Sequence, residues 1–312
     1  KVAGYVIMTD KEHMPETKLE NVHCYEDLLA AEDDDFAWPE FDELTASSLC
    51  YTSGTTGNPK GVLYSHRSTV LHAMVASLPD CASLSCHSVV MPVVPMFHVN
   101  AWGMPYAALL TGAKLVLPGN GMDGASLSDL MSKEQVTLAL GVPTIWQSLF
   151  KYLDEHPVSL EHWREVFIGG AALDKALLMR FEKAGITTIQ AWGMTELSPI
   201  GVVNRPLPDS GVEGSDTARQ ERLKQGRGIW GVGLRIVDDN DQPQPWDGVT
   251  TGHLQVRGHW VAAQYFKYQE SACTDDGWFA TGDIAHIDPR GFLKLTDRSK
   301  DVIKSGGEGI SS

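Results

Sequence analysis

The sequence predicts an α/β fold, in which largely parallel sheets with flanking helices are joined to a smaller β-rich subdomain. Between residues 114 and 189, short apolar segments typical of buried strands alternate with helical segments, as in βαβ units around a parallel sheet. From about residue 231 onward the apolar side chains recur at every second position, which indicates strands with one buried face. The 312 residues, of which 43% are hydrophobic and 21% charged, suffice for one large globular domain or two ordinary ones.

Strand, turn and helix-boundary signals give the elements in chain order. First come a strand within 2–8, a helix at 25–30, a solvated acidic loop at 32–35, two strands around a polar turn at 51–61, a helix at 65–78, a strand from 89 and a helix from about 102. Strands at 114–117, 136–140, 165–168 and 187–189 then alternate with helices at 124–132, 143–153 and 174–184. Further strands are expected at 234–237, 253–257 and 292–295, with turns at 238–241 and 288–291. The polar stretch 204–227 is expected to be a solvated connection, with Arg205 and Arg219 to Arg222 at the surface.

The turn at 51–61 combines glycines, hydroxyls and one lysine between two apolar strands. Glycines let the backbone approach a ligand closely, and consecutive main-chain N–H groups in such a turn form a concavity for anions. Lys60 adds a mobile charge suited to phosphate. The turn is not the helix-opening Gly-Lys-Ser/Thr pattern, because Pro59 precedes the lysine and Gly61 follows it. An ordinary surface turn needs two or three such residues, whereas this one has three glycines and four serine or threonine hydroxyls.

Two more loops are expected at the carboxyl ends of parallel strands, where such sheets bind their ligands. The loop at 169–173 has small residues that let an aromatic base lie against the backbone, although a plain strand–helix turn is the alternative. The loop at 190–196 offers a stacking face at Trp192, a hinge at Gly193, a phosphate hydroxyl at Thr195 and a hard oxygen ligand for Mg²⁺ at Glu196.

Residues 51–61 and 190–196 resemble the phosphate-binding motif and the adenine-and-metal motif of the adenylate-forming superfamily, which contains acyl-CoA synthetases, luciferases and amino-acid adenylation domains. The resemblance runs from about residue 51 to the end of the chain. It implies catalytic roles for Lys60, Thr195 and Glu196, with Mg²⁺ on Glu196. It also implies that ATP binds at Thr52, Ser53, Gly54, Thr55, Thr56, Gly57, Lys60, Gly170, Ala171, Ala172, Gln190, Ala191, Trp192, Gly193, Met194, Thr195, Asp283 and Arg298.

The last two of these residues are assigned to the ribose. A carboxylate can accept both ribose hydroxyls, and an arginine can add fixed donors. The alternative is that Asp283 is a turn aspartate and Arg298 a surface arginine.

His98 lies in a Pro-Met-Phe-His segment, and a lone histidine of this kind is usually a core residue. In acyl-CoA synthetases a similar segment borders the carboxylate pocket, and its aromatic residue gates acyl entry. The resemblance therefore favours a substrate pocket formed by His98, Trp102, Gly103, Gly170 and Trp192. Amino-acid adenylation domains usually have an aspartate here, but no carboxylate lies between residues 91 and 111, which favours a plain carboxylic acid.

The chain is most similar to AMP-forming acyl-CoA synthetases of the medium-chain and 3-methylmercaptopropionate type. The resemblance implies that a fatty or short- to medium-chain acid attacks ATP, giving an acyl-adenylate and pyrophosphate, and that CoA then displaces AMP. Mg²⁺ and CoA are therefore expected as metal and cosubstrate. Two alternatives stay open: another adenylating enzyme, such as an aryl-CoA ligase or a luciferase-like enzyme, and a non-catalytic nucleotide-binding remnant.

The resemblance also sets domain limits. Residues 1–203 form a nucleotide- and acyl-binding core that is incomplete at its N-terminus, 204–300 the β-rich subdomain, and 301–312 the hinge region and the start of a missing C-terminal domain. Lys300 falls at the hinge, and the CoA channel is assigned to Ser305, Gly306, Gly307 and Glu308. Such an internal fragment lacks the family's C-terminal lysine, so weak ATP binding and poor turnover are expected. The chain departs from the family pattern at His253, His259 and Gly309.

Charge and cysteine content exclude some classes of partner. A net charge of −15 argues against nucleic acid or anionic membranes as general partners. Prolines and polar residues interrupt the most apolar stretch, 89–118, so no transmembrane segment is expected. The five cysteines form no C-x-x-C pair, which fits reduced thiols in the cytoplasm, although an N-terminal targeting signal is not readable from residue 1. A homodimer is left open.

Overall fold

The computed structural model describes residues 2–52, 58–212, 214–298, 303–305 and 308–310. The chain forms two compact units, Lys1–Asp42 and Glu43–Ser312. In the first unit, a parallel pair of strands, β1 (Tyr5–Ile7) and β2 (Val22–Cys24), is followed by helix α1 (Tyr25–Ala30). The predicted strand within 2–8 and the predicted helix at 25–30 are confirmed.

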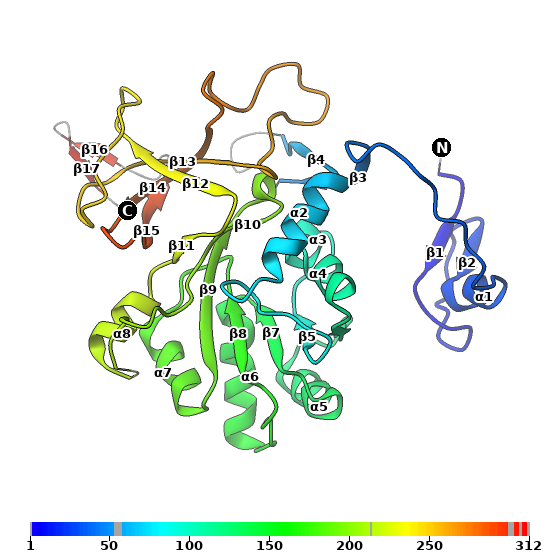
Figure 1. Cartoon of the computed structure of the whole chain (residues 1–312). Helices are drawn as coiled ribbons and strands as arrows, with labels where there is room; N and C mark the ends of the chain where they lie inside the picture. The colour runs from blue at the N-terminus through cyan, green and yellow to red at the C-terminus, as the bar shows by residue number, and fades with distance from the viewer. Residues whose placement is uncertain (1, 53–57, 213, 299–302, 306–307, 311–312) are drawn as a thin grey trace. The chain divides into compact units, whose positions relative to one another are not determined.

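A seven-stranded sheet forms the centre of the second unit (Figure 1). Its strands, in spatial order, are β11 (Arg227–Gly228), β10 (Ile200–Val203), β9 (Thr187–Gly193), β8 (Glu165–Ile168), β7 (Leu138–Gly141), β5 (Val89–Pro92) and β6 (Lys114–Leu115). The strands from β9 to β6 pair in parallel, whereas β10 and β11 add an antiparallel edge. The predicted α/β fold with a largely parallel sheet is therefore confirmed.

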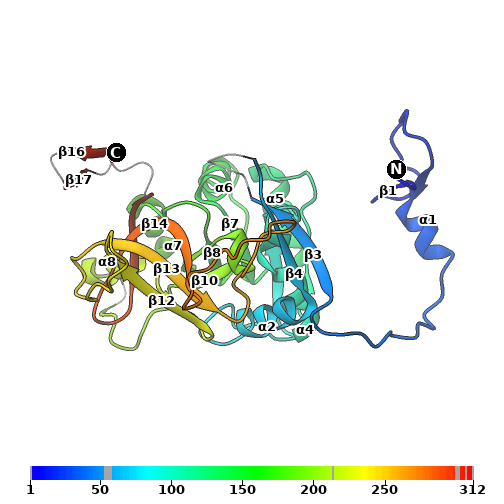
Figure 2. The ribbon, with the colours of Figure 1, turned by 90° about the horizontal axis from the view of Figure 1, so that it is seen from above.

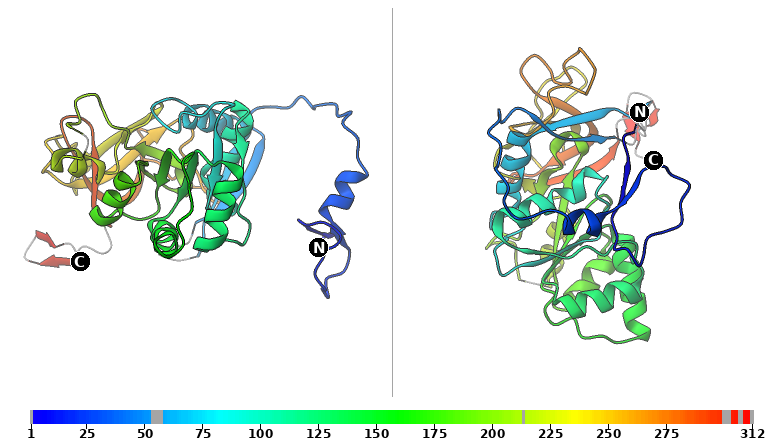
Figure 3. Two further views of the ribbon diagram at one scale, coloured as in Figure 1. Left: turned by 90° about the horizontal axis from the view of Figure 1, so that it is seen from below. Right: turned by 90° about the vertical axis from the view of Figure 1, so that its right-hand side faces the viewer.

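Helices cover both faces of this sheet (Figures 2 and 3). On one face lie α2 (His66–Ala76) and α4 (Met104–Thr111), and on the other α5 (Gly124–Glu134), α6 (Pro143–Glu155) and α7 (Lys175–Lys183). Successive side chains of a strand point to opposite faces. On β7, Leu138 and Leu140 accordingly pack with the α2 and α4 layer, whereas Ala139 packs with the other layer. A central strand that is buried on both faces reads as a nearly continuous apolar run, as β7 does.

Capping residues set the starts of the helices. The Ser65 hydroxyl accepts the Ser68 N–H, and the Ser68 hydroxyl accepts the Ser65 N–H, so α2 begins in a reciprocal capping box. Asp123 and Asp174 accept backbone N–H groups at the starts of α5 and α7, and Pro143 opens α6. Each such cap contributes about 1 kcal/mol. These four helices begin within one residue of the predicted positions.

The predicted β-rich part is a four-stranded antiparallel sheet of β12 (Val232–Val237), β13 (Gly252–Gly258), β14 (Phe279–Ile287) and β15 (Leu293–Arg298). Its apolar face packs against Leu197 and Val202, which follow the end of β9. Two hairpins complete the unit: β3 (Ala46–Tyr51) with β4 (Gly61–Ser65), and β16 (Ile303–Ser305) with β17 (Glu308–Ile310). The two strands predicted on either side of the 51–61 turn are therefore confirmed.

The prediction of a solvated connection at 204–227 is wrong. The segment contains helix α8 (Asp216–Arg222) and strand β11, and Arg205, Arg219 and Arg222 are half-buried. Arg205 donates to both carboxylate oxygens of Glu165 at 2.5 and 2.9 Å, and Arg219 donates to Glu182 at 2.8 Å. Arg222 donates to a carbonyl oxygen of β9 at 2.6 Å. Alternating charge alone could not reveal these partners, because β8, α7 and β9 bring them from distant parts of the chain.

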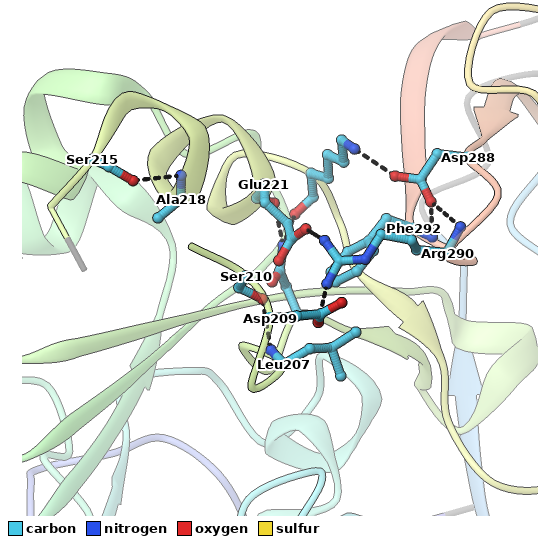
Figure 4. Close-up of polar contacts among 11 residues, drawn as sticks. Leu207, Asp209, Ser210, Ser215, Ala218, Glu221, Asp288, Arg290 and Phe292 are labelled. Carbon is cyan, nitrogen blue, oxygen red and sulfur yellow. Dashed lines mark hydrogen bonds and ion pairs between the residues drawn. The ribbon is translucent and has the colours of Figure 1, made fainter. Parts of the chain in front are cut away.

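An ion-pair network ties α8 to the turn between β14 and β15 (Figure 4). Arg290 pairs with Glu221 of α8 and with Asp209, and Lys224 pairs with Asp288 at 2.6 Å. Glu221 is the most enclosed member of this network, with 10% of its side chain exposed. Polar contacts therefore add to the apolar core in joining the four-stranded sheet to the helical layer.

Replacing Arg290 by alanine is expected to lower the free energy of unfolding by about 2 kcal/mol, because the enclosed Glu221 loses a charged hydrogen-bond partner. Denaturant unfolding at neutral pH measures this difference. The control is Arg67→Ala, which removes an ion pair with Glu43 whose two side chains are 50% and 67% exposed. That loss should be below about 1 kcal/mol. Equal losses in the two variants would contradict the prediction.

Candidate active site

The loops after β5, β8 and β9 meet at the carboxyl edge of the parallel sheet. Gly169 follows β8, and a Cβ atom there would lie 3.1 Å from the Trp102 ring and 3.3 Å from a carbonyl oxygen of β9. Glycine therefore leaves room for the Trp102 indole, which is 8% exposed. Gly170 has a positive φ of 75° and is exposed, as are Ala171 and Ala172. The predicted base-binding turn presents an open backbone beside a buried indole.

Residues 190–193 belong to strand β9, so the prediction of a loop beginning at residue 190 is wrong. Gln190 pairs with Ile168 of β8, and Gly193 pairs with Ile200 of β10. Strands on both sides satisfy this backbone, and local sequence does not show them. The Gln190 side chain is 2% exposed, and its Oε1 has no hydrogen-bond partner among the described residues. A buried acceptor of this kind is a place where a polar group of a ligand can bind.

The chain turns sharply after Gly193. A Cβ atom on this residue would overlap the carbonyl oxygen of Pro199, which accepts the Met194 N–H at 3.0 Å. A single 3₁₀ turn, η1 (Thr195–Leu197), follows and contains Glu196. Trp192 and Met194 pack against the apolar cluster of the four-stranded sheet. The predicted Thr–Glu corner is therefore held between the end of the central sheet and the β-rich part.

Two tyrosines fix this corner. Tyr64 of β4 donates its hydroxyl to the carbonyl oxygen of Thr195 at 2.6 Å, and Tyr265 donates to Oε1 of Glu196 at 2.7 Å. The backbone oxygen of Glu196 accepts the Ala262 N–H at 2.7 Å. Burial raises the pKa of both tyrosines, and at Tyr265 the hydrogen bond to Glu196 raises it further. Both hydroxyls therefore stay protonated and act as donors at neutral pH.

Lys60 lies over the same tyrosine. Its Nζ is 4.6 Å from the centre of the Tyr265 ring and 5.9 Å from that of Tyr268. At the neck of the turn, the Thr52 N–H donates to the Lys60 carbonyl at 2.9 Å, and the Lys60 N–H donates to the Thr52 hydroxyl at 3.3 Å. Lys60 and Glu196 thus converge on one side chain. The other predicted residues of this turn lie outside the described residues: Ser53, Gly54, Thr55, Thr56 and Gly57.

The segment between β13 and β14 brings Tyr265 to this place. It extends from the four-stranded sheet to the β3–β4 hairpin, where the Phe266 N–H donates to the Gly61 carbonyl at 2.8 Å (Figure 2). A Cβ atom on Gly61 would lie 3.2 Å from Cβ of Phe266, so the two backbones are in close contact. Trp260 is 2% exposed and donates its Nε1 to the carbonyl oxygen of Ile200 at 3.2 Å. One segment therefore links the β-rich sheet, the hairpin and β10.

The loop after β5 forms a left-handed turn. All four residues of α3 (Val99–Trp102) have φ between 45° and 57°, so the regular helix predicted from about residue 102 starts instead at Met104. This left-handed conformation destabilises the fold by about 1–2 kcal/mol for each residue that is not glycine. Asn100 helps to offset this cost, because its side chain accepts from the Cys50 thiol at 2.8 Å and donates to the Tyr106 hydroxyl at 2.6 Å.

This turn carries the predicted acid-pocket residues. His98 is exposed directly before it, and Gly103 follows Trp102 with a φ of 76°. Strain of this type persists where the surroundings hold it, and it is common at functional sites. The pocket role of His98, Trp102 and Gly103 stays a prediction.

The two residues predicted for the ribose are neighbours on adjacent strands, since Asp283 of β14 pairs in register with Arg298 of β15. Asp283 is 8% exposed and lies between Phe279 and Ala285, which pack in the cluster that also contains Leu197. Ser305 and Glu308 are register partners in the β16–β17 hairpin. The Arg298 side chain, Lys300, Gly306 and Gly307 lie outside the described part of the structure.

The sequence motifs do not point to Tyr64, Trp260 or Tyr265. No spacing rule joins them to the predicted motifs, because each comes from a different part of the chain. One signal was available: residues 265–268 hold three aromatic rings in four positions of a largely polar segment.

Within the described residues, no helix is long and apolar enough to cross a membrane.

Comparisons with known proteins identify the family of this chain. Residues 6–266 match the family described as AMP-binding enzyme. Over its whole length the chain is 50% identical to 3-methylmercaptopropionyl-CoA ligase of Ruegeria pomeroyi and 49% identical to medium-chain-fatty-acid–CoA ligase of Ectopseudomonas oleovorans, of which it spans 58% and 57%. The fold matches O-succinylbenzoate coenzyme A synthetase of Bacillus subtilis, solved in complex with ATP and magnesium ion. The TM-score is 0.76 and the identity 25%, over 93% of this chain and 58% of that one. The chain belongs to the AMP-binding enzyme family.

Proposed function

We propose that this chain forms the adenylation site of an acid–CoA ligase, in which ATP activates a carboxylic acid and CoA then takes the acyl group as a thioester. The convergence of Lys60 and Glu196 on Tyr265 is the observation that carries this proposal. An ammonium group suited to phosphate and a carboxylate suited to Mg²⁺ then act within the same small volume.

The Glu196 carboxylate fits a magnesium ion. Mg²⁺ usually binds to one or two protein carboxylates, with substrate phosphates and water as its other ligands. Glu196 is buried and oriented through one oxygen by Tyr265, which leaves the second oxygen for a metal. The described residues form no cluster of three or more His, Cys, Asp or Glu side chains, so phosphate oxygens and water would complete the coordination. When bound, the ion would neutralise charge on the phosphates.

In the first step, a carboxylate oxygen of the acid attacks the α-phosphorus of ATP, and the bond to pyrophosphate breaks. The N–H groups of the 51–61 turn and Lys60 offset the charge that develops on the leaving pyrophosphate, while Thr195 binds a phosphate oxygen. Asp283 and Arg298 hold the ribose, and Trp192 stacks on the adenine beside residues 170–172. In the second step, the sulfur of CoA attacks the acyl carbonyl carbon and AMP leaves.

The acid enters beside the left-handed turn, where His98, Trp102 and Gly103 line its pocket. No carboxylate between residues 91 and 111 could pair with a substrate ammonium, which favours an acid without an amino group. The names of the two curated relatives refer to aliphatic acids, and we expect a short- or medium-chain aliphatic acid here as well.

All five cysteines are unpaired, which supports a reducing, cytoplasmic location.

Exchange of labelled pyrophosphate into ATP tests this proposal. The chain is incubated with ATP, Mg²⁺, labelled pyrophosphate and one acid at a time, and CoA thioesters are then sought by mass spectrometry. Exchange should be slow, as the sequence predicts for this chain, but it should depend on the acid and be fastest with short- and medium-chain aliphatic acids, and Glu196→Gln should abolish it. Preference for aromatic acids would favour an aryl-CoA ligase. ATP binding without exchange for any acid would favour a nucleotide-binding remnant.

A further inference from the structure

One side chain outside the predicted motifs contacts both charged groups of the proposed site. The Tyr265 hydroxyl lies 2.7 Å from Oε1 of Glu196, and the face of its ring lies 4.6 Å from Nζ of Lys60. The ring also packs against Phe279 and Tyr268, with centroid distances of 6.5 and 6.0 Å. The hydroxyl group of this tyrosine thus contacts a carboxylate, and the face of its ring contacts an ammonium group.

The backbone around Tyr265 is bonded at the same two places. The Ala262 N–H donates to the carbonyl oxygen of Glu196 at 2.7 Å, and the Phe266 N–H donates to the carbonyl oxygen of Gly61, directly after Lys60, at 2.8 Å. A side chain supported in this way is held in one orientation before any ligand arrives. Precise placement of ligand-binding groups depends on such support.

We infer that Tyr265 is a positioning residue, whose hydroxyl orients the Glu196 carboxylate for a metal and whose ring keeps the Lys60 ammonium beside it for phosphate. The inference rests on the proposed function, which assigns Mg²⁺ to Glu196 and phosphate to Lys60. In the described part of the chain, the tyrosine contacts both groups, and they form no ion pair with each other. Direct pairing of the two charges would compete with binding of the metal and the phosphate.

The two parts of the side chain can be separated by substitution. Tyr265→Phe keeps the ring under Lys60 and removes only the donor to Glu196. Loss of a hydrogen-bond partner behind a metal ligand typically weakens metal binding by about 10- to 100-fold. Tyr265→Leu removes the ring as well, and the lost cation–π contact should weaken phosphate binding by a further factor of about 2 to 5.

Calorimetric titration of the chain with ATP, repeated over a series of Mg²⁺ concentrations, measures both effects. In Tyr265→Phe, the Mg²⁺ concentration that half-saturates the increase in ATP affinity should rise about 10-fold or more. The affinity for ATP without Mg²⁺ should stay within about 2-fold of the wild type, and only Tyr265→Leu should lower it beyond that. The matched control is Tyr268→Phe, which removes a hydroxyl three residues further along the same segment and should change neither quantity.

Glu196→Gln provides a second comparison, because the Tyr265 hydroxyl acts on the metal only through this carboxylate. In that background, Tyr265→Phe should no longer change the Mg²⁺ dependence, as expected for two coupled residues. Unfolding curves are recorded for every variant. Lower stability together with a wild-type Mg²⁺ half-saturation would give Tyr265 a purely structural role and overturn the inference.

The outcomes distinguish this inference from the proposed function. If the wild type binds ATP in a Mg²⁺-dependent manner and Tyr265→Phe matches it, the inference fails and the proposed function stands. If the wild type shows no Mg²⁺-dependent binding of ATP, the proposed function fails and the inference falls with it.

Discussion

Replacing Gly193 by alanine is expected to abolish Mg²⁺-dependent ATP binding and to lower the free energy of unfolding by about 3 kcal/mol, at the upper end of the usual cost of overpacking. The added Cβ atom would overlap the carbonyl oxygen of Pro199. That oxygen cannot move away cheaply, because it accepts the Met194 N–H at 3.0 Å and the next residue, Ile200, donates to the buried His72 at 3.1 Å. The displacement should therefore fall on the Thr–Glu corner.

Calorimetry with ATP and denaturant unfolding measure the two effects separately. The control is Gly233→Ala, also in a strand, where a Cβ atom would lie 3.4 Å from the Trp278 ring, an ordinary contact. This substitution should leave ATP binding unchanged and alter stability by less than about 1 kcal/mol. A Gly193→Ala variant that binds ATP like the wild type would show that the corner tolerates the shift.

The sequence predicted the central fold well, because the fold depends on local patterns. Apolar runs that alternate with helical periods predicted the parallel strands from β7 to β9, and the helices predicted at 65–78 and 174–184 begin within one residue of those positions. Prediction failed where distant strands decide the outcome. Residues 190–193 continue β9 because β8 and β10 supply hydrogen-bond partners, and Arg205 is covered because β8 presents Glu165.

The residues of the candidate site likewise include some that the sequence predicted and some that it could not. Lys60 and Glu196 were predicted from the chemistry of their own motifs, and their shared contact with Tyr265 brings the two motifs together. Tyr265 itself could not be predicted, because its position depends on backbone hydrogen bonds to Glu196 and Gly61 from a segment that follows β13. Sequence thus predicts which groups would act on a ligand, whereas the residues that contact those groups are visible only in the tertiary structure.

Buried His72 links the same corner to helix α2. It is 2% exposed, its Nε2 accepts the Ile200 N–H at 3.1 Å, and its ring meets Trp260 edge to face at 6.0 Å. A Cβ atom on Gly103 would lie 2.7 Å from the imidazole, so a glycine at that position makes room for it. Burial lowers the pKa of His72 from 6.5 to about 3. The ring is therefore neutral in the folded protein at any pH well above 3, and it can accept the Ile200 N–H.

This histidine should make the protein sensitive to mild acid. Its pKa is lower in the folded state, so between about pH 6.5 and pH 3 the unfolded chain binds a proton that the folded chain does not. The free energy of unfolding should accordingly fall by about 1.4 kcal/mol for each pH unit in this range. Between about pH 6.5 and about pH 4.5 the total loss should be nearly 3 kcal/mol. Asp288 adds to the acid sensitivity only at lower pH. Burial raises the pKa of its carboxyl group, but the hydrogen bond from Lys224 acts against burial, and the pKa stays below 3.8. The stability that this carboxylate contributes is therefore lost below about pH 4.

His72→Gln is expected to remove most of this acid sensitivity. A glutamine oxygen can still accept the Ile200 N–H but does not titrate, so the variant can be less stable at pH 7 and yet lose less stability between pH 6 and pH 4.5. Denaturant unfolding at several pH values measures the slope. The control is His87→Gln, which replaces an exposed histidine and should keep the wild-type slope. Parallel curves for the wild type and His72→Gln would mean that other groups set the acid limit, because the proton taken up on unfolding would then not belong to His72.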